Sequence, residues 1–288
     1  MTFPGTDDSK YSWEKQQLRG SPMSNLLVRP TQPDEQGRII EITPATAGWQ
    51  YVGFEVYQLQ PGQVLEQETG DQEVCLVLVG GKANISTGDQ LWKNIGHRMD
   101  PFEKTPPYAA YIPDNSQFRV EATTPLELAV CKAPGFGNHK ARLIEPDERK
   151  CSTRGQGTNT RFIQDILPDC EDADSLLVVE VYTPGGNWSS YPPHKHSEDN
   201  LPHESFLEEI YYHRLNPCQG FAFQRVYTDD RSLDETMSVE NQNVVLVPKG
   251  YHPVGAPHGY DLYYLNVMAG PKRAWKFHND PAHEWMLK

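Results

Sequence analysis

The stretch that decides the fold runs from Gly185 to His213 and reads G-G-N-W-S-S-Y-P-P-H-K-H-S-E-D-N-L-P-H-E-S-F-L-E-E-I-Y-Y-H. It contains an H-x-H pair, His194 and His196, directly after two prolines. Side chains two positions apart point to the same side of a strand, whereas on a helix they do not share a face. The pair therefore predicts a strand that presents two imidazoles to one side.

Two neighbouring segments offer further ligands for a metal ion. Glu209 opens the run E-I-Y-Y, which is typical of a strand, and His252 follows V-V-L-V-P-K-G, a strand that ends in a turn. Imidazoles and a carboxylate from neighbouring strands can converge on one divalent ion and leave coordination positions open. Imidazole suits Zn, Fe, Ni and Cu, and the carboxylate extends the choice to Mn. The predicted metal ligands are His194, His196, Glu209 and His252.

The composition narrows both the fold and the class of ligand. With 288 residues the chain is long enough for one large or two ordinary domains. Its 24 Pro, 22 Gly and 14 Tyr favour many short strands and turns over helices. A formal net charge of -13 argues against nucleic-acid binding, which needs a basic face. An anionic small molecule stays compatible with this charge, because local Arg and Lys side chains decide its binding.

The cysteines and the N-terminal residues predict where the protein works. The 5 Cys form no C-x-x-C pair, and their wide spacing indicates reduced thiols. The N-terminus is polar and has no apolar region of the signal-peptide kind. No apolar run approaches the ~20 residues that a membrane helix needs. We therefore expect a soluble, cytoplasmic protein without a membrane partner.

The two halves of the chain repeat the same order of strand and turn signals. F-E-V-Y-Q-L-Q-P-G at 54–62 parallels V-V-E-V-Y-T-P-G-G at 178–186. A-Y-I-P-D-N-S-Q-F at 110–118 parallels L-V-P-K-G-Y-H-P at 246–253. Two similar units rich in strands predict an all-β fold of duplicated sandwiches or barrels of the jelly-roll kind, with few short helices.

The repeat also predicts where the two domains end and which residues of the first half correspond to those of the second. The expected domains are residues 1–140 and 141–288, and R-F-I-Q-D-I-L at 161–167 is the best candidate for a short helix. The alignment sets E-V-C-L-V-L-V at 73–79 against E-I-Y-Y-H-R-L at 209–215, so that Glu73 stands opposite Glu209.

The imidazoles of the second half have poor counterparts in the first. Gln117 stands in place of His252, and E-Q-E at 66–68 stands in place of H-K-H. Glutamine and glutamate are weak substitutes for imidazole at a transition-metal site. We therefore expect the N-terminal domain to be metal-free and to close one side of the C-terminal domain, which carries the metal.

The motifs of the second half resemble those of cupins, small β-barrels with a metal at the mouth. The longer matches are R-G-Q-G-T-N-T-R-F-I-Q-D-I-L-P (154–168), Y-P-P-H-K-H (191–196), L-E-E-I-Y-Y-H-R-L-N-P (207–217), V-L-V-P-K-G-Y-H-P-V (245–254) and N-V-M-A-G-P-K-R-A-W (266–275). They resemble the bicupin uronate isomerases, a family that includes the 5-deoxy-glucuronate isomerases of inositol breakdown and the uronate ketol-isomerases of pectin breakdown. The resemblance extends over essentially the whole chain, and it implies a duplicated cupin.

The resemblance implies an aldose–ketose isomerase that converts 5-deoxy-D-glucuronate to 5-dehydro-2-deoxy-D-gluconate, so the expected partner is a small anionic sugar acid. One divalent metal per chain would stabilise the enediolate, and Zn suffices because the reaction has no net redox change. Mn, Fe and Ni stay open. The alternatives are a uronate ketol-isomerase of the pectin type, an Fe(II) cupin dioxygenase and a non-catalytic sugar-binding cupin. Because cupin sheets often pair, a homodimer or larger homo-oligomer is a further expectation.

One departure from ordinary cupins concerns the ligand carboxylate. Ordinary cupins place only a few residues between the second histidine and the glutamate, whereas twelve residues, 197–208, intervene here. Glu208 and Glu209 are adjacent and therefore point to opposite faces of a strand. Matching E-I-Y-Y to the family's strand selects Glu209. The inserted segment is a candidate lid over the site.

The residues that move the proton and bind the substrate are less constrained. Candidates for the catalytic base are Tyr251, Lys249, His213, Tyr211 and Glu208. The substrate carboxylate calls for a guanidinium, which can pair with it through two hydrogen bonds. The candidates for substrate binding are Arg225 on an aromatic strand, Arg154 and Arg161 in R-G-Q-G-T-N-T-R, and Tyr211.

Overall fold

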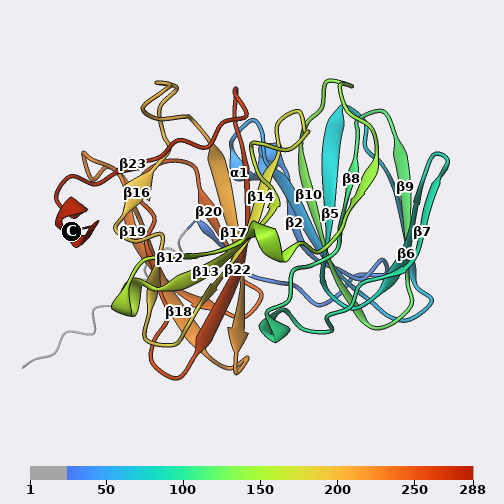
Figure 1. The fold of residues 1–288 in the computed structure, drawn as a ribbon, viewed down its shortest axis with the longest axis horizontal. Helices are drawn as coiled ribbons and strands as arrows, with labels where there is room; N and C mark the ends of the chain where they lie inside the picture. The colour runs from blue at the N-terminus through green and yellow to red at the C-terminus, as the bar shows by residue number, and fades with distance from the viewer. Residues whose placement is uncertain (1–24, 288) are drawn as a thin grey trace, which may run out of the picture.

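The computed structural model describes residues 25–287, which form two β lobes side by side (Figure 1). These described residues contain one short α-helix, α1 (Pro44–Ala47). Single 3₁₀ turns are η2 (Pro101–Glu103), η3 (Glu148–Lys150), η4 (Gly157–Asn159) and η5 (Glu284–Leu287). Within residues 25–287, no helix is long and apolar enough to cross a membrane. The expected all-β duplicated fold with few short helices is therefore confirmed.

The first lobe is built from two antiparallel sheets. The larger sheet runs β11 (Arg142–Ile144), β8 (Ala109–Ile112), β5 (Gln72–Gly80), β10 (Leu126–Pro134), β3 (Gly53–Leu59) and β2 (Arg38–Ile42). The smaller sheet runs β4 (Val64–Glu68), β9 (Gln117–Ala122), β6 (Ala83–Thr87) and β7 (Gln90–Ile95). The glycines at 80–81 end β5 at the turn that leads into β6 of the smaller sheet, so β5 and β6 do not form a hairpin.

The second lobe repeats this plan with a longer main sheet. That sheet runs β1 (Leu27–Val28), β20 (Val244–Val247), β17 (Glu208–Asn216), β22 (Asp261–Ala269), β14 (Leu177–Thr183), β13 (Arg161–Leu167) and β12 (Cys151–Arg154). A second sheet runs β15 (Trp188–Ser189), β21 (Val254–Gly255), β18 (Phe221–Tyr227) and β19 (Asp234–Glu240), and a small pair joins β16 (His194–Lys195) to β23 (His278–Asn279).

The two lobes pack through their main sheets, which explains the unbroken apolar runs. In β5, Val74, Leu76 and Leu78 belong to the interior of the first barrel. The alternate residues Cys75 and Val77 belong instead to a core shared with the second lobe. Both faces of the strand are thus buried, so an apolar side chain is favoured at every position.

Strand pairing corrects one prediction from the sequence and bears on a second. Residues 161–167 form the strand β13 and not a helix, because they pair with β14 in the middle of the main sheet. Strands also cross the expected boundary at 140/141, since β1 pairs with β20 of the second lobe and β11 pairs with β8 of the first. The boundary itself stays a prediction.

Two buried carboxylates, one from each lobe, accept backbone hydrogen bonds from the opposite lobe in a symmetric arrangement. Glu208 accepts hydrogen bonds from the backbone N–H groups of 50–52, at 2.7, 2.7 and 3.1 Å. Glu73 accepts the N–H groups of 174–176 in the other lobe, at 2.7, 2.6 and 2.6 Å. Glu73 therefore corresponds to Glu208, and the alignment of Glu73 with Glu209 is wrong by one residue.

A buried ion pair also crosses between the lobes. Arg98 of the first lobe donates two hydrogen bonds to Glu180 of β14, at 2.7 and 2.8 Å. Tyr263 donates a third hydrogen bond to this carboxylate, at 2.9 Å. Both charged side chains are almost fully buried, with 2% and 0% exposed, so each depends on the other for its stabilisation.

We expect the variant Arg98→Ala to lose about 3–5 kcal/mol of unfolding free energy, because it leaves the Glu180 carboxylate buried without its counter-ion. Chemical denaturation followed by fluorescence measures this loss. The matched control is a double variant, Arg98→Met with Glu180→Leu, which removes both charges and should recover much of the stability. A single variant as stable as the parent protein would contradict the prediction.

Candidate active site

Strand β17 divides its side chains between the two faces of the main sheet. Glu209, Tyr211 and His213 point into the second barrel, and all three are buried. The alternate residues Ile210 and Tyr212 face the first lobe, where the Tyr212 ring lies 5.9 Å from that of Phe54. The period of two thus sets Glu209, Tyr211 and His213 inside one barrel, while Ile210 and Tyr212 pack toward the first lobe.

The H-x-H pair lies on a short strand held by the C-terminal segment. In β16, His194 pairs with Asn279 and Lys195 with His278 of β23. The Lys195 ammonium points away from the histidines and binds Asp229 at 2.7 Å. This alternation leaves the two imidazoles on the barrel side of the strand.

Three of the four predicted ligands converge on one point. Nε2 of His196 lies 2.8 Å from Oε2 of Glu209, and Nε2 of His252 lies 3.1 Å from the same oxygen. One ligand atom from each of these residues lies within 4.8 Å of the other two. The spacing therefore fits three ligands around a single ion.

The hydrogen bonds behind the two rings orient their lone pairs toward this point. Nδ1 of His196 donates to the carbonyl of Leu207 at 3.0 Å, and Nδ1 of His252 donates to the carbonyl of Gly250 at 2.8 Å. A carbonyl oxygen can only accept, so in neutral rings each Nε2 carries a lone pair. Nε2 of His252 is buried without a hydrogen-bond partner. Lone pairs that converge with a carboxylate require a cation between them, and a divalent metal fits that requirement.

Electrostatics favour a neutral His252 and His194 beside an ionised Glu209, whereas at His196 the effect of burial is outweighed by the adjacent Glu209 carboxylate, which raises the pKa of the ring. Burial lowers the pKa of His252 to about 4 and that of His194 well below its usual range. Burial alone would raise the pKa of Glu209, but the neighbouring His252 and His196 outweigh it and lower that pKa. Neutral imidazoles around an ionised carboxylate are the forms that coordinate a metal ion.

His194 lies beside this cluster and against the cavity. Its ring centre is 4.9 Å from that of His252 and 4.7 Å from that of Phe277 in the C-terminal segment. It does not belong to the group whose ligand atoms all lie within 4.8 Å of one another. As a fourth ligand, His194 stays a prediction.

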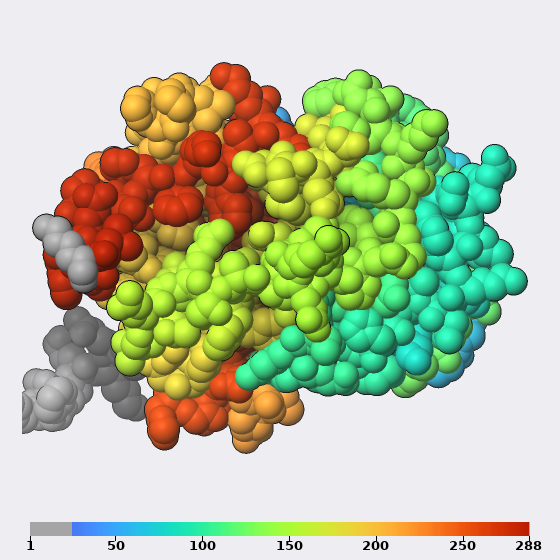
Figure 2. Space-filling model, viewed as in Figure 1, coloured from blue at the N-terminus to red at the C-terminus, as the bar shows by residue number. Residues whose placement is uncertain are grey.

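A cavity of about 540 Å³ opens outward from His194. It is bounded by the segment around residues 154–161 and by the C-terminal segment, which lie side by side on one face of the second lobe (Figure 2). A smaller hollow of about 40 Å³ continues inward to Glu209, Tyr211 and Tyr264. The two spaces share His194, Arg154, Arg161 and Trp275, so the metal cluster lies at the inner end of an open path.

Arg161 is the charged side chain best placed to meet an anion in this path. Its Nη1 donates to the carbonyl of Asn159 at 3.1 Å, and no carboxylate contact to it is present among the described residues. Burial lowers the pKa of Arg161. Tyr264 and Tyr211 counteract this effect, but neither side chain carries a full charge at neutral pH. Desolvating a guanidinium without an acid is costly, which indicates that an anionic ligand completes the pair.

Two more groups in the wall support an oxygen-rich anion. The Arg154 guanidinium lies over the Trp275 ring, 5.5 Å from its centre. The indole Nε1 of Trp275 is buried and has no hydrogen-bond partner within the described chain. An unpaired donor and two guanidinium groups around one cavity favour a carboxylate or hydroxyl ligand.

Several predicted site residues lie away from this path. Arg225 makes two hydrogen bonds to Asp234 at 2.7 and 2.6 Å, on the outer surface of β18. The hydroxyl of Tyr251 donates to Asp229 at 2.9 Å, and Lys249 is exposed to solvent. None of the three predicted residues, Arg225, Tyr251 and Lys249, lines the two connected cavities.

Two other candidates for the base are buried behind the site. His213 accepts or donates at Nε2 toward Gln224 at 2.9 Å, and burial lowers its pKa to about 4. Its ring stacks on Tyr211 at 5.9 Å, so Tyr211 separates it from the cavity. Glu208 faces the first lobe through its three backbone hydrogen bonds. Of the candidate bases, only Tyr211 lines the inner hollow.

The inserted segment 197–208 is held in place beside the barrel. Glu204 is 5% exposed and accepts the backbone N–H groups of Ser197 and Glu198. Ser205 exchanges hydrogen bonds with Lys276, at 2.9 and 3.0 Å. No residue of the segment lines the two connected cavities. A lid role for this segment stays a prediction.

The first barrel carries no equivalent set of ligands. The corrected register sets Val74 in the place of Glu209, because Val74 pairs with Ile112 as Glu209 pairs with Val247. The match of Gln117 with His252 is also wrong by one residue, because Gln117 is exposed whereas Phe118 is buried in the barrel as His252 is. A valine has no atom that can bind a metal, so the expectation of a metal-free first domain gains a physical reason.

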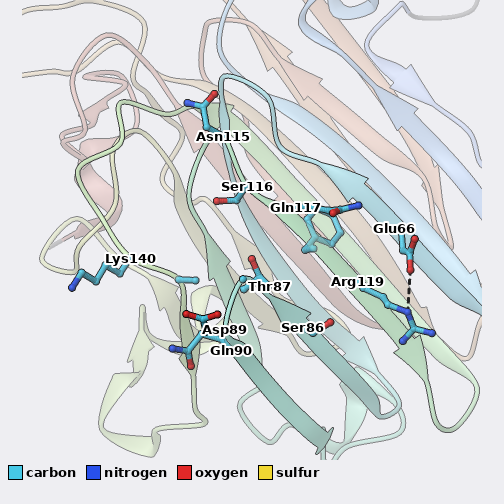
Figure 3. A pocket seen from close by; sticks show the side chains of 13 residues that line it. Glu66, Ser86, Thr87, Asp89, Gln90, Asn115, Ser116, Gln117, Arg119 and Lys140 are labelled. Carbon is cyan, nitrogen blue, oxygen red and sulfur yellow. Dashed lines mark hydrogen bonds and ion pairs between the residues drawn. The ribbon is translucent and has the colours of Figure 1, made fainter.

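A hollow of about 830 Å³, larger than the cavity beside His194, lies beside strands β4, β6 and β9 of the first lobe (Figure 3). Figure 3 shows Gln117 and Ser116 on its wall and Arg119 paired with Glu66, at 3.0 Å. Its charged side chains are exposed and no ligand cluster lies in it. Size alone therefore does not mark the active site.

Sequence reasoning missed three residues of the site: Trp275, Tyr264 and Asn266. Asn266 hydrogen bonds to Glu209 and donates to the carbonyl of Ile210 at 3.2 Å, which holds the ligand strand. A signal was present, because Tyr264 and Asn266 alternate on β22 within the motif that runs to Trp275. The same alternation that selected Glu209 and Tyr211 would have selected them.

Comparisons with known proteins agree with this geometry. The model of the KduI/IolB family matches residues 26–286. A 5-deoxy-glucuronate isomerase of Geobacillus kaustophilus is 62% identical over 266 residues, which cover 92% of this chain and 96% of that protein. A 5-deoxy-glucuronate isomerase of Bacillus subtilis strain 168 is 50% identical over 270 residues, covering 92% and 100%.

Solved structures show the same fold. An IolB-like protein from Salmonella typhimurium is 53% identical, with a TM-score of 0.89 over 92% of this chain and 100% of that chain. An oxalate decarboxylase of Lactobacillus farciminis is 13% identical, with a TM-score of 0.61 over 90% and 89%. This second likeness concerns the fold alone, and it confirms the duplicated cupin architecture.

Proposed function

The chain belongs to the KduI/IolB family, and we propose that it is a 5-deoxy-glucuronate isomerase whose second barrel performs the reaction with one bound divalent metal ion. The substrate, 5-deoxy-D-glucuronate, is an aldehyde, and the product, 5-dehydro-2-deoxy-D-gluconate, is the corresponding ketone. The observation that carries the metal proposal is the convergence of two imidazole lone pairs and the Glu209 carboxylate inside the barrel. The identity with the relatives supports the choice of substrate.

The ligands we assign are His196, Glu209 and His252, with His194 as the fourth. When bound, a divalent ion acts as a Lewis acid toward the carbonyl oxygen and stabilises the negative charge of the enediolate. Zn meets this need without redox chemistry, and Mn, Fe and Ni suit the same donor set. The carbonyls of Leu207 and Gly250 hold the imidazoles in the orientation that the ligand role demands.

The orientation of the substrate follows from the charges along the path. Arg161, assisted by Arg154, binds the carboxylate at the outer end, because it is the partly buried guanidinium without an acid partner. The aldehyde end then reaches the inner hollow beside Tyr211. Arg225, Tyr251 and Lys249, which lie elsewhere, have no part in this assignment. The Trp275 indole N–H is free to bind a substrate oxygen.

The cellular setting proposed from the sequence remains the cytoplasm. All five cysteines are free, and two of them, Cys75 and Cys131, are buried in the interface between the lobes. Free thiols are typical of a reducing compartment. A homodimer or larger homo-oligomer stays a prediction.

The proposal is tested by metal analysis and by NMR of the reaction with 5-deoxy-D-glucuronate. We expect about one metal per chain and formation of the keto acid. Chelation should slow the reaction by about 10³-fold or more, since Lewis-acid stabilisation is worth several kcal/mol. Readdition of metal should restore it. Full activity after complete metal removal would contradict the metal role, and no turnover by the metal-loaded protein would contradict the substrate.

A further inference from the structure

The inner hollow needs a group that can pass on a hydroxyl proton, and the sequence candidates do not supply it. Aldose–ketose conversion moves one proton between two carbons and a second proton between the two neighbouring oxygens. Besides His194, Glu209 and the arginines, the side chains in the lining of the inner hollow that can both give and take up a proton at an oxygen are the hydroxyls of Ser190, Tyr211 and Tyr264. Tyr211 and Ser190 are already paired, at 2.9 Å.

Tyr264 is built into the wall of the hollow by the alternation of β22. It pairs with Val181 of β14 and with His213 of β17, and its side chain is 3% exposed. Its ring centre lies 4.8 Å from that of Tyr211. The adjacent Tyr263 points to the other face and binds Glu180. Of these two neighbouring tyrosines, Tyr263 binds Glu180 on one face of the sheet, and Tyr264 lines the hollow on the other face.

The surroundings of the Tyr264 hydroxyl favour proton exchange with a ligand. The hydroxyl interacts with the side chains of Ser189 and Ser190, and the Arg161 guanidinium lies near enough to act on it. Burial raises the pKa of Tyr264, so the side chain is a neutral phenol at neutral pH. A neutral phenol can donate one hydrogen bond and accept another at the same time.

The first barrel provides an internal comparison. Leu128 occupies the place of Tyr264, since Leu128 pairs with Leu78 and Tyr57 as Tyr264 pairs with His213 and Val181. Leu76 occupies the place of Tyr211 in the same register. The same interior positions are thus aliphatic in the barrel without a metal cluster. Packing of the fold does not require a phenol there, which points to a chemical use in the second barrel.

We propose that the Tyr264 hydroxyl carries the hydroxyl proton between the two adjacent oxygens of the substrate during isomerisation, with Ser190 and Tyr211 holding it in position. The proposal rests on the proposed function. The O–H bond on the carbon next to the aldehyde breaks, and its proton goes to the phenol oxygen. The phenol's own proton goes to the former aldehyde oxygen, where a new O–H bond forms. The phenol is regenerated, and no electron leaves the substrate. The carbon-bound proton moves in a separate transfer.

The test compares Tyr264→Phe with the parent enzyme, both loaded with metal. We expect kcat to fall about 100-fold, in the range of general acid–base catalysis, while KM changes less than threefold. Binding of D-gluconate, a sugar acid that lacks the aldehyde, should stay within threefold. The variant's kcat should become more sensitive to replacing H2O by D2O, because transfer of the hydroxyl proton then limits turnover. The control is Tyr260→Phe, which removes a hydroxyl outside the cavity and should keep the parent kcat.

Three results would overturn the proposal. A kcat within threefold of the parent would show that the hydroxyl is dispensable. A fall in kcat with an unchanged solvent isotope effect would assign Tyr264 a structural role, as would a matching loss of D-gluconate affinity. Failure of the proposed function is a different result, since the parent enzyme itself would then not turn over 5-deoxy-D-glucuronate.

Discussion

Replacing His252 by alanine abolishes isomerase activity and weakens metal binding by more than about 100-fold, while the two lobes stay folded. Removing a direct ligand must exceed the 10- to 100-fold loss that removal of a supporting hydrogen bond causes. The ring is 0% exposed and its Nε2 lies 3.1 Å from the Glu209 carboxylate, so the variant also leaves that carboxylate poorly compensated. Metal content by elemental analysis and turnover by NMR measure the two losses, and circular dichroism checks the fold.

The matched control for this variant is Gln117→Ala in the first barrel. The sequence repeat matches Gln117 with His252, but the side chain of Gln117 is exposed, and Val74 takes the place of Glu209 in this barrel. It should retain both metal and activity. If Gln117→Ala abolishes activity, the first barrel takes part in the chemistry. If His252→Ala retains its metal, the ion is bound elsewhere.

Replacing Arg161 by alanine lowers kcat/KM for 5-deoxy-D-glucuronate by about 10²- to 10³-fold, mostly through KM. Loss of one partner of a buried, hydrogen-bonded charge pair costs about 2–5 kcal/mol, and each 1.4 kcal/mol is tenfold. Arg161 has no carboxylate contact among the described residues, so the substrate is the acid that the guanidinium would meet. Metal content should stay at the parent level, because Arg161 is not a ligand.

A neutral substrate separates charge recognition from general damage to the site. For the analogue with a hydroxymethyl group in place of the carboxylate, we expect the parent enzyme and Arg161→Ala to differ by less than tenfold. The control Arg225→Ala breaks the pair with Asp234 on the outer sheet and should leave kcat/KM unchanged. Equal losses for the acid and the neutral analogue would contradict the assignment, and so would a large effect of Arg225→Ala.

The proposed metal ligands were predictable as candidates because their signals are local. The H-x-H spacing of His194 and His196, the strand opened by Glu209 and the turn before His252 each depend on a few neighbouring residues. Period-two alternation then sets Glu209 and Tyr211 on one face of β17 without reference to the rest of the fold. The duplicated barrel was predictable for a similar reason, because both halves carry the same order of strands and turns.

The register between the two halves could not be read in this way. The sequence aligned Glu73 with Glu209. In the structure Glu73 corresponds to Glu208 instead, because each of these two carboxylates accepts backbone hydrogen bonds from the other lobe. A shift of one residue reverses the face of every side chain on a strand. Only the contacts between the lobes distinguish Glu209, the proposed metal ligand, from Glu208, whose carboxylate accepts backbone hydrogen bonds from the first lobe.

The sequence by itself determined the family and the fold, and it singled out the histidines and the glutamate that cluster in the second barrel. Tertiary structure decided which of several arginines and tyrosines lie at that site. Arg225 is neutralised by Asp234 across a sheet, whereas Arg161 meets no acid within residues 25–287, and the hydroxyl of Tyr263 is bound to Glu180 while Tyr264 faces the hollow. The physical reason is that the use of a charged or hydroxyl group depends on its partners. Those partners come from strands far apart in the chain.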